Sequence, residues 1–269
     1  MERSPVELSG RGAGIVTHDV RVEALVACDR DGARVAPLPH PQVVTSRDRV
    51  HRSLRDALPA GRDHLGSRVA GHEDGGDAVR VGLSNDETRE ADLLVGADGF
   101  RSAVRARMLP EVGPTCSGHV VRRALAPEAA LPEPGREAIL PAFASFAAHG
   151  TQIIGYPIAG PGNDRRPGHR RYDFVLHAKA EGPDDMPTDA EGIRHAASIP
   201  PPPIRDDVLA AMREDAEARL PAPFPTILDH SERPLSTPIH HHHSAVTGSA
   251  GWRCRATRPA WRGRMAAWG

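Results

Sequence analysis

The sequence predicts a mixed α/β fold, because three different patterns of apolar residues occur along it. Apolar side chains recur at every fourth position in residues 50–58, which predicts a helix with one apolar stripe. Apolar and other residues alternate in residues 79–83, which predicts a half-buried strand. The unbroken apolar run within residues 92–95 is typical of a strand that is covered on both faces.

The first half of the chain supplies a helix, a meander and a strand, in that order. Thr45 or Ser46 is the candidate N-cap of the helix, and we expect the stripe of that helix to pack on a sheet. Turns at residues 74–77 and 85–86 separate extended segments, which predicts a small antiparallel meander. The meander leads directly into the apolar strand at residues 92–95.

The second half predicts another domain, built on a sheet. Beyond Pro110 there are short strand candidates, among them QIIGYPIAG and RRYDFVLHA, separated by proline and glycine. Residues 204–220 predict a helix that covers this sheet through Val208, Met212, Ala216 and Leu220. We therefore expect three segments, at residues 1–109, 110–225 and 226–269.

The bulk composition favours a small-molecule partner. Among 269 residues, 34 basic and 35 acidic side chains give a formal charge of -1, which provides no field to attract nucleic acid or an anionic membrane. No apolar run reaches the length of a membrane span, and the first residues do not form a signal peptide, so we expect a cytoplasmic protein. The three cysteines lack CxxC spacing, which argues against a disulfide framework or a zinc site.

Two glycines flank a carboxylate at the end of the apolar strand, in the stretch VGADGFRSAVR. Gly96, Asp98 and Gly99 expose backbone at the carboxyl edge of a sheet, where α/β proteins bind ligands. Ser102 and Arg105 follow in the next helix, where amide groups and a guanidinium can contact phosphate oxygens. A dinucleotide pyrophosphate fits such a corner. The alternative is that Asp98 only caps the helix.

The longer stretch DLLVGADGFRSAVR resembles the Asp-Gly motif of FAD-dependent aromatic hydroxylases, the para-hydroxybenzoate hydroxylase class. The segment ERSPVELSGRGAGIV is similar to the part of their FAD domain that follows its second strand. The resemblance implies that Glu2 binds the adenosine ribose and that Arg11, Gly12 and Arg47 lie near the flavin. For Arg11 and Arg47, surface salt bridges are the alternative.

The segments ALAPEAALP and GYPIAGPGNDRRPGHRRYDFVLH look most like the 2,6-dihydroxypyridine 3-monooxygenase branch. In all, the likeness covers residues 2 to about 239. It implies a Rossmann-like FAD-binding domain, present as a remnant, plus a sheet-based substrate domain. It also implies FAD as cofactor, NADH or NADPH as co-substrate, and the hydroxylation of a small aromatic ring with O2. A homodimer is compatible with the sequence, which does not determine the oligomeric state.

The chain departs from this family at both ends. The GxGxxG turn that opens such enzymes has no counterpart, since no strand precedes Gly10, Gly12 and Gly14. After Ile239 come four histidines and then the stretch GWRCRATRPAWRGRMAAWG, residues 251–269, which shows no helical or strand period, so we expect no regular structure in that stretch. We interpret this tail as the product of a frameshift, because a GC-rich back-translation in another frame yields the family's Gly-Asp-Ala motif.

The same interpretation makes His240–His243 an out-of-frame run and not a metal site. We therefore expect an FAD-dependent monooxygenase that is inactive as given. The alternative is a non-catalytic remnant that binds a ligand or a partner.

Overall fold

The computed structural model describes residues 19–133, 135–148, 150–180, 188–193, 195, 204–243, 248–249 and 252–254. They form two compact units, each built from two separate stretches of chain. The large unit comprises Met1–Pro59 and Gly118–Pro238, and the small unit comprises Ala60–Ser117 and Ile239–Gly269. Each unit thus combines two separate stretches of chain, whereas each segment expected from the sequence is one continuous stretch. The function assigned to each segment stays a prediction.

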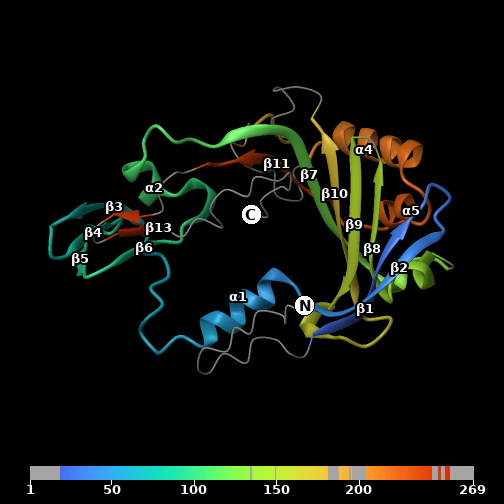
Figure 1. Ribbon diagram of the computed structural model, residues 1–269, viewed down its shortest axis with the longest axis horizontal. Coiled ribbons are helices and arrows are strands. Elements are labelled where there is room, and N and C mark those ends of the chain that lie inside the picture. The colour runs from blue at the N-terminus through green and yellow to red at the C-terminus, as the bar shows by residue number, and fades with distance from the viewer. Residues whose placement is uncertain are drawn as a thin grey trace. The chain divides into compact units, whose positions relative to one another are not determined.

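The large unit is built on a seven-stranded sheet in the order β11-β7-β10-β9-β8-β1-β2 (Figure 1). Its strands are β1 (Val20–Cys28), β2 (Arg34–Val44), β7 (Thr115–Pro127), β8 (Ala142–Ala148), β9 (Thr151–Ile158), β10 (Arg171–Lys179) and β11 (Leu235–His241). Strands β7, β10, β9 and β8 pair antiparallel, and β1 pairs parallel with β8 and antiparallel with β2. The predicted strands QIIGYPIAG and RRYDFVLHA are thus neighbours in this sheet.

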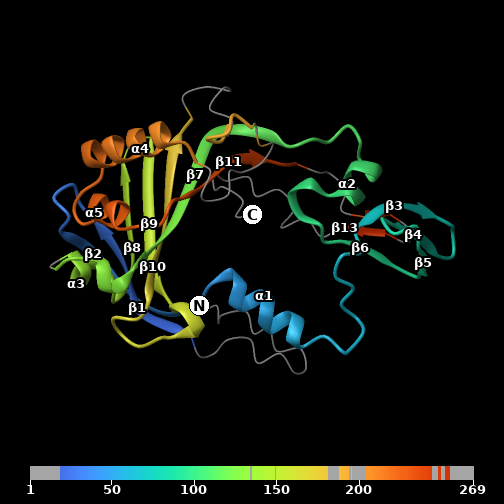
Figure 2. The same ribbon diagram turned by 180° about the vertical axis from the view of Figure 1, so that it is seen from behind.

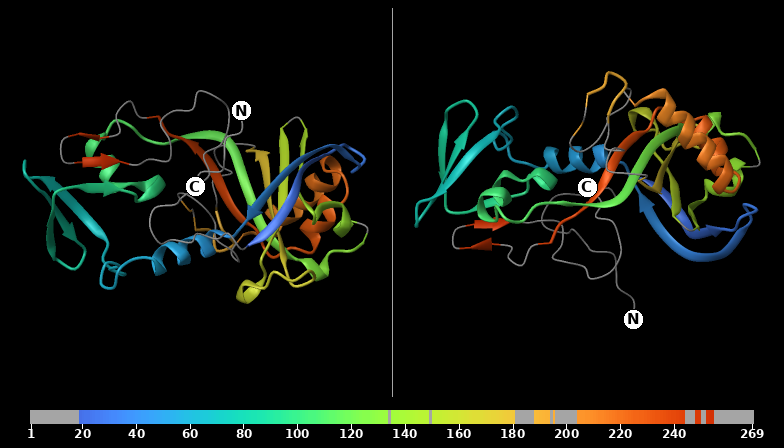
Figure 3. Two further views of the ribbon diagram at one scale, coloured as in Figure 1. Left: turned by 60° about the horizontal axis from the view of Figure 1, so that its bottom comes forward. Right: turned by 90° about the horizontal axis from the view of Figure 1, so that it is seen from above.

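Helices α4 (Asp206–Arg219) and α5 (Phe224–Asp229) cover one face of this sheet, as Figures 2 and 3 show. The main core lies between them and the strands, with Phe174 and Phe224 fully buried. The predicted stripe on α4 is confirmed, since Met212, Ala216 and Leu220 are buried in that core and Val208 packs against it. The short helix α3 (Gly135–Ile139) adds Ile139 to the same core.

Helix α1 (Arg47–Asp56) begins where the sequence predicts, with Ser46 as its N-cap. The Ser46 hydroxyl accepts a hydrogen bond from the backbone N–H of Arg49 at 3.2 Å. The expectation that its stripe packs on a sheet is wrong, because Leu54 is 47% exposed and Leu58 is 49% exposed. A four-residue period places side chains on one face of a helix, but it does not provide a second element to cover that face.

The small unit contains the predicted meander. Strands β3 (Val69–Asp74), β4 (Val79–Leu83) and β5 (Thr88–Ala91) pair antiparallel in sequence order. Val79 and Val81 are buried on one face, where they pack with Leu94 and Met108. The alternation in residues 79–83 therefore gives one buried face, as the period of two predicts.

Strand β6 (Leu94–Gly96) is followed by a short 3₁₀ turn, Gly99–Arg101, and by helix α2 (Ala103–Met108). The expectation that this strand is covered on both faces is wrong for the residues that the structure describes. Leu93 is 51% exposed and Val95 is 46% exposed. An apolar run shows that a strand is able to be buried, and only neighbouring elements decide whether it is.

Regular structure also extends beyond Ile239, and β13 lies within residues 251–269, where none was expected. Strand β11 continues to His241, and β12 (Gly248–Ser249) pairs antiparallel with β13 (Trp252–Cys254). The backbone of β13 in turn pairs parallel with β6. Strand pairing uses main-chain N–H and C=O groups, so it does not require an alternating side-chain pattern. Among the described residues, no helix is both long and apolar enough to cross a membrane.

Candidate functional site

The predicted ligand corner lies in the small unit, where β6 turns into α2. A Cβ placed on Gly96 would lie 2.8 Å from the Cβ of Val104, so this glycine permits close packing of the helix on the strand. Gly99 has a φ of +74°, a conformation that glycine adopts without strain. A Cβ at Gly99 would meet no atom within 4 Å, so the backbone there is open to approach. Close packing thus explains the glycine at position 96, and the positive φ explains the glycine at position 99.

Asp98 caps α2. Its Oδ2 accepts hydrogen bonds from the backbone N–H groups of Ala103 at 2.7 Å and Val104 at 3.4 Å. Burial alone would raise the pKa of the Asp98 carboxyl, but hydrogen bonds from the Ser102 side chain and from these backbone groups outweigh it, so the pKa lies below its usual range. The Ser102 hydroxyl in turn accepts from the Arg105 N–H at 2.9 Å. This carboxylate is ionised and held in place.

Arg105 folds back over the turn. Its guanidinium donates to the carbonyl oxygens of Gly99 and Phe100, and its Nε is shielded from solvent without a hydrogen-bond partner among the described residues. The polar groups of the corner are therefore engaged with one another, which is the geometry of a helix cap. A cofactor phosphate would have to compete with these contacts, and the cofactor role of these residues stays a prediction.

The other predicted cofactor residues lie apart from this corner in the sequence. Glu2, Arg11 and Gly12 lie outside the described residues. Arg47 is the first residue of α1 in the large unit, where it lines a cavity of about 820 Å³. A volume of this size is in the usual range for small-molecule sites. The sequence did not predict this cavity.

The cavity lies between α1 and residues of the large sheet. Its apolar lining includes Leu125, Ile158 and Ala159, and the loop between β9 and β10 closes another side through residues 160–163. Charged side chains also line it: Arg47, Asp48, Arg49, Arg52, Asp56, Arg123, Arg171, Asp173, Glu232 and Arg233. Charged side chains therefore outnumber apolar ones in the lining of this cavity.

A buried ion pair lies at this cavity. The Arg123 Nε donates to Asp173 Oδ1 at 2.9 Å, and its Nη2 donates to Asp173 Oδ2 and, at 3.1 Å, to the hydroxyl of Tyr156. The Asp173 side chain is only 3% exposed. The hydrogen bond to Asp173 raises the pKa of Arg123, so the guanidinium stays charged. The Tyr156 ring stacks on Phe143 with centroids 4.9 Å apart, which fixes the position of its hydroxyl.

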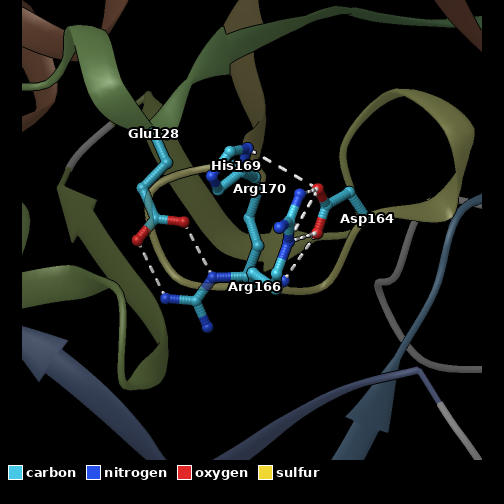
Figure 4. Close-up of polar contacts among 5 residues, drawn as sticks. All are labelled: Glu128, Asp164, Arg166, His169 and Arg170. Carbon is cyan, nitrogen blue, oxygen red and sulfur yellow. Dashed lines mark hydrogen bonds and ion pairs between the residues drawn. The ribbon is translucent and has the colours of Figure 1, made fainter.

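A second polar network stiffens the loop that borders the cavity (Figure 4). Arg170 forms a bidentate pair with Glu128, with N–O distances of 2.8 and 2.9 Å, and the Glu128 side chain is 5% exposed. Within the loop, Asp164 binds Arg166 and lies 3.5 Å from the ring of His169. The loop is thereby tied to the sheet at its end and folded on itself in its middle.

One sequence signal could have identified the ion pair. In RRYDFVLHA a single carboxylate, Asp173, interrupts an otherwise apolar run at a strand position. Buried charges are almost always paired, so such an interruption predicts a partner on a neighbouring strand. Its partner Arg123 lies 50 residues earlier in the chain, and only the pairing of β7 with β10 brings the two together.

His240, the first residue of the histidine run, contacts an aromatic ring. The His240 ring lies against Phe100, with centroids 4.8 Å apart and the planes tilted by 46°. Among the described residues, no three histidine, cysteine or acidic side chains gather as a metal site requires.

Comparisons with known proteins bear on this fold. A family profile described as FAD binding domain-like matches residues 116–241. The 2,6-dihydroxypyridine 3-monooxygenase of Paenarthrobacter nicotinovorans is 29% identical over 219 residues, which are 74% of this chain and 54% of that protein. The 3-amino-4-hydroxybenzoate 2-monooxygenase of Streptomyces cremeus is 31% identical over 140 residues, which are 48% of this chain and 34% of that protein.

A solved structure, the 2,6-dihydroxypyridine-3-hydroxylase from Arthrobacter nicotinovorans, superposes with a TM-score of 0.80 at 24% identity and covers 88% of this chain and 60% of that one. The predicted mixed α/β fold and the resemblance to FAD-dependent aromatic hydroxylases are confirmed. The chain spans about half the length of the first of these relatives. FAD is therefore the cofactor that the matched family implies.

Proposed function

We propose, from this resemblance to FAD-dependent aromatic hydroxylases, that the protein belongs by descent to the monooxygenases that hydroxylate an aromatic or N-heteroaromatic ring with NADH or NADPH and O2, and that the chain as given is inactive. The observation that carries the proposal is the large sheet, because the family profile covers residues 116–241 and most of that sheet. The relatives named above act on rings with and without a carboxylate, so they leave the ring class open.

FAD would supply the redox chemistry, and the residues of this chain would bind and orient the two reactants. Gly99 leaves an open backbone at the corner, and Asp98 and Arg105 are charged groups of the same corner. Arg47 lines the cavity of the large unit, where Leu125 and Ile158 would supply apolar surface for a flat ring. The full proposed cofactor set is Glu2, Arg11, Gly12, Arg47, Gly96, Asp98, Gly99, Ser102 and Arg105.

The test is a titration of the purified protein with FAD, followed by flavin fluorescence and visible absorbance. We expect Asp98→Ala to weaken FAD binding by about 1 to 3 kcal/mol, the usual effect of removing one charged hydrogen-bonding partner. Asp98→Asn serves as the control, since its amide oxygen still caps α2. If Asp98→Ala and the wild type bind FAD equally, Asp98 is a helix cap and has no cofactor role.

A second candidate is a non-catalytic protein that binds a ring or a partner without flavin. The observation that favours it is the internal engagement of Asp98 and Arg105, whose polar atoms contact α2 and the preceding turn. Under this candidate the chain as given is inactive. Ring binding without any FAD binding would support it, whereas ring-dependent oxidation of NADH or NADPH would exclude it.

A further inference from the structure

Arginines are in excess around a second recess of the large unit, which has a volume of about 460 Å³. It is lined by residues 19–21, at the start of β1, and by residues of the loop between β9 and β10. The charged side chains of the lining are Arg21, Arg165, Arg166, Arg170, Asp19 and Asp164. A recess of this size with more positive than negative side chains is a candidate site for a small anion.

Both carboxylates of this lining are already engaged. Asp19 accepts a hydrogen bond from the hydroxyl of Thr45 at 2.6 Å and lies 3.8 Å from Arg49, and its side chain is only 1% exposed. Both oxygens of Asp164 accept from the Nε of Arg166, at 3.0 and 3.1 Å. Each carboxylate therefore has a positive charge beside it, which reduces the repulsion that an incoming anion would meet.

Three arginines of the lining use only part of their donor capacity within the chain. Arg170 binds Glu128 through Nε and Nη2, and Figure 4 shows the third nitrogen of its guanidinium pointing away from that carboxylate. Arg166 binds Asp164 through its Nε and Nη2. Arg21 donates from its Nε to a neighbouring exposed carboxylate at 2.7 Å. In the part of the chain that the structure describes, the Nη1 donors of all three form no hydrogen bond.

The paired carboxylates orient the guanidinium groups and leave one edge of each available. An arginine has five N–H donors, and a bidentate pair uses one on Nε and one on Nη2. Arg166 and Arg170 each retain a fork formed by Nη1 and the second donor of Nη2. The side chains of Glu128 and Arg170 are 5% and 17% exposed, so this fork is held in place before a ligand arrives.

Asn163 adds a neutral donor to the recess. Its φ of +63° lies in the left-handed region, which asparagine adopts more readily than most residues. Its backbone N–H donates to the carbonyl of Gly160 at 3.1 Å, whereas its side-chain amide forms no hydrogen bond within the described residues. The recess therefore combines guanidinium forks with an amide N–H group, and both kinds of donor suit an oxyanion.

We propose that this recess is a binding site for a small anion that carries a phosphate group. The planar fork of a guanidinium matches two oxygens of a phosphate. A phosphate presents oxygens in further directions, so it can also accept from Arg21 on β1 and from Asn163. A carboxylate has two oxygens in one plane and satisfies a single fork. The free phosphate ion and the phosphate of a larger metabolite share this chemistry, and a recess of about 460 Å³ has room for both.

The experiment is a calorimetric titration of the purified chain with inorganic phosphate, AMP and acetate at constant ionic strength. We expect phosphate to bind saturably with one ion per chain, and acetate to bind about tenfold or more weakly, because it satisfies fewer charged donors. Tighter binding of AMP than of phosphate would assign the site to a larger metabolite, and AMP binding no tighter would assign it to the free ion. If phosphate does not bind saturably, or if acetate binds as tightly, the charges only stabilise the loop and the proposal is wrong.

Arg21→Gln and Arg166→Gln test the recess itself. Their side chains are 64% and 72% exposed, so we expect both variants to fold. We expect each to weaken phosphate binding about tenfold, since each removes a charged donor. The matched control is Arg30→Gln in the turn after β1, which removes an exposed arginine outside the lining and leaves binding unchanged. Binding that survives both substitutions, or that falls equally in the control, would refute the recess as the site.

The recess and the proposed function are tested separately. Phosphate binding that depends on Arg21 and Arg166, in a chain that binds no FAD, would retain the recess and reject the cofactor. Because AMP is also a part of FAD, AMP binding that both substitutions leave unchanged would belong to a cofactor site and would reject the recess as the site of AMP. FAD binding without saturable phosphate binding would retain the cofactor and reject the recess.

Discussion

Replacing Glu128 by glutamine tests whether the loop network holds the β9–β10 connection in place. Glutamine keeps the size of the side chain and one carbonyl oxygen, so it removes the charge without leaving a large cavity. The native pair is bidentate, with N–O distances of 2.8 and 2.9 Å, and its side chains are 5% and 17% exposed. The substitution therefore leaves the Arg170 guanidinium largely buried without its counter-charge.

The expected loss follows from that burial. Breaking a fully buried ion pair by removing one partner costs about 3 to 5 kcal/mol. Arg170 retains some contact with water, and the glutamine oxygen still accepts one hydrogen bond, so we expect a loss of about 2 to 3 kcal/mol in the free energy of unfolding.

The loss also depends on pH. Burial would raise the pKa of Glu128, but the hydrogen bonds from Arg170 and from the backbone N–H of Gly168 outweigh it and lower the pKa from its ordinary value of 4.5. A lowered carboxyl pKa stabilises the fold fully above the unfolded value and less as the pH falls through the folded one. The difference between wild type and variant should therefore be constant near neutral pH and shrink below about pH 4.5.

The assay is urea unfolding followed by far-UV circular dichroism, together with hydrogen exchange of peptides from β9 and β10. The control is Asp164→Asn in the same loop, whose partner Arg166 is 72% exposed, and we expect a much smaller loss there. If Glu128→Gln destabilises no more than Asp164→Asn, or if its effect is the same at acidic and neutral pH, the buried pair does not stabilise the loop.

Three further substitutions test the packing. Gly155→Ala should cost about 1 to 3 kcal/mol in thermal unfolding, because the new Cβ would lie 2.4 Å from Cε1 of the buried Tyr172, and an unchanged midpoint would contradict this. Ser46→Ala should weaken α1 by about 1 kcal/mol, seen as faster exchange of the Arg49 amide, and unchanged exchange would show that the cap is dispensable. Leu54→Gln should change stability by less than about 0.5 kcal/mol, since Leu54 is 47% exposed, and a larger loss would mean that the stripe of α1 is covered.

Local sequence patterns predicted where helices and strands form better than they predicted which faces of those elements are buried. The cap at Ser46, the meander and the α4 stripe depend on residues a few positions apart, and each appears where the sequence places it. The burial of Leu54 and Val95 was predicted wrongly, because burial depends on elements elsewhere in the chain. Pairing of β13 with β6 had no sequence signal, since it uses main-chain groups that every residue but proline carries.

The same distinction between local and long-range features applies to the two candidate sites. The stretch VGADGFRSAVR identified the strand-turn-helix corner, and the structure shows how Asp98 and Arg105 are engaged within it. The cavity and its ion pair were not predicted, because Arg123 and Asp173 are far apart in sequence and only the pairing of β7 with β10 brings them together.

The sequence by itself determined the mixed fold, the turn chemistry and the resemblance to a flavin-dependent family, because these depend on local spacing and on short motifs. Only the tertiary structure decided which faces are covered and which charges meet. The register of β7 on β10 places Arg123 within hydrogen-bonding distance of Asp173, and that register results from long-range pairing summed over the whole sheet. Two charges that lie 50 residues apart in the sequence therefore become, through the sheet, one ion pair.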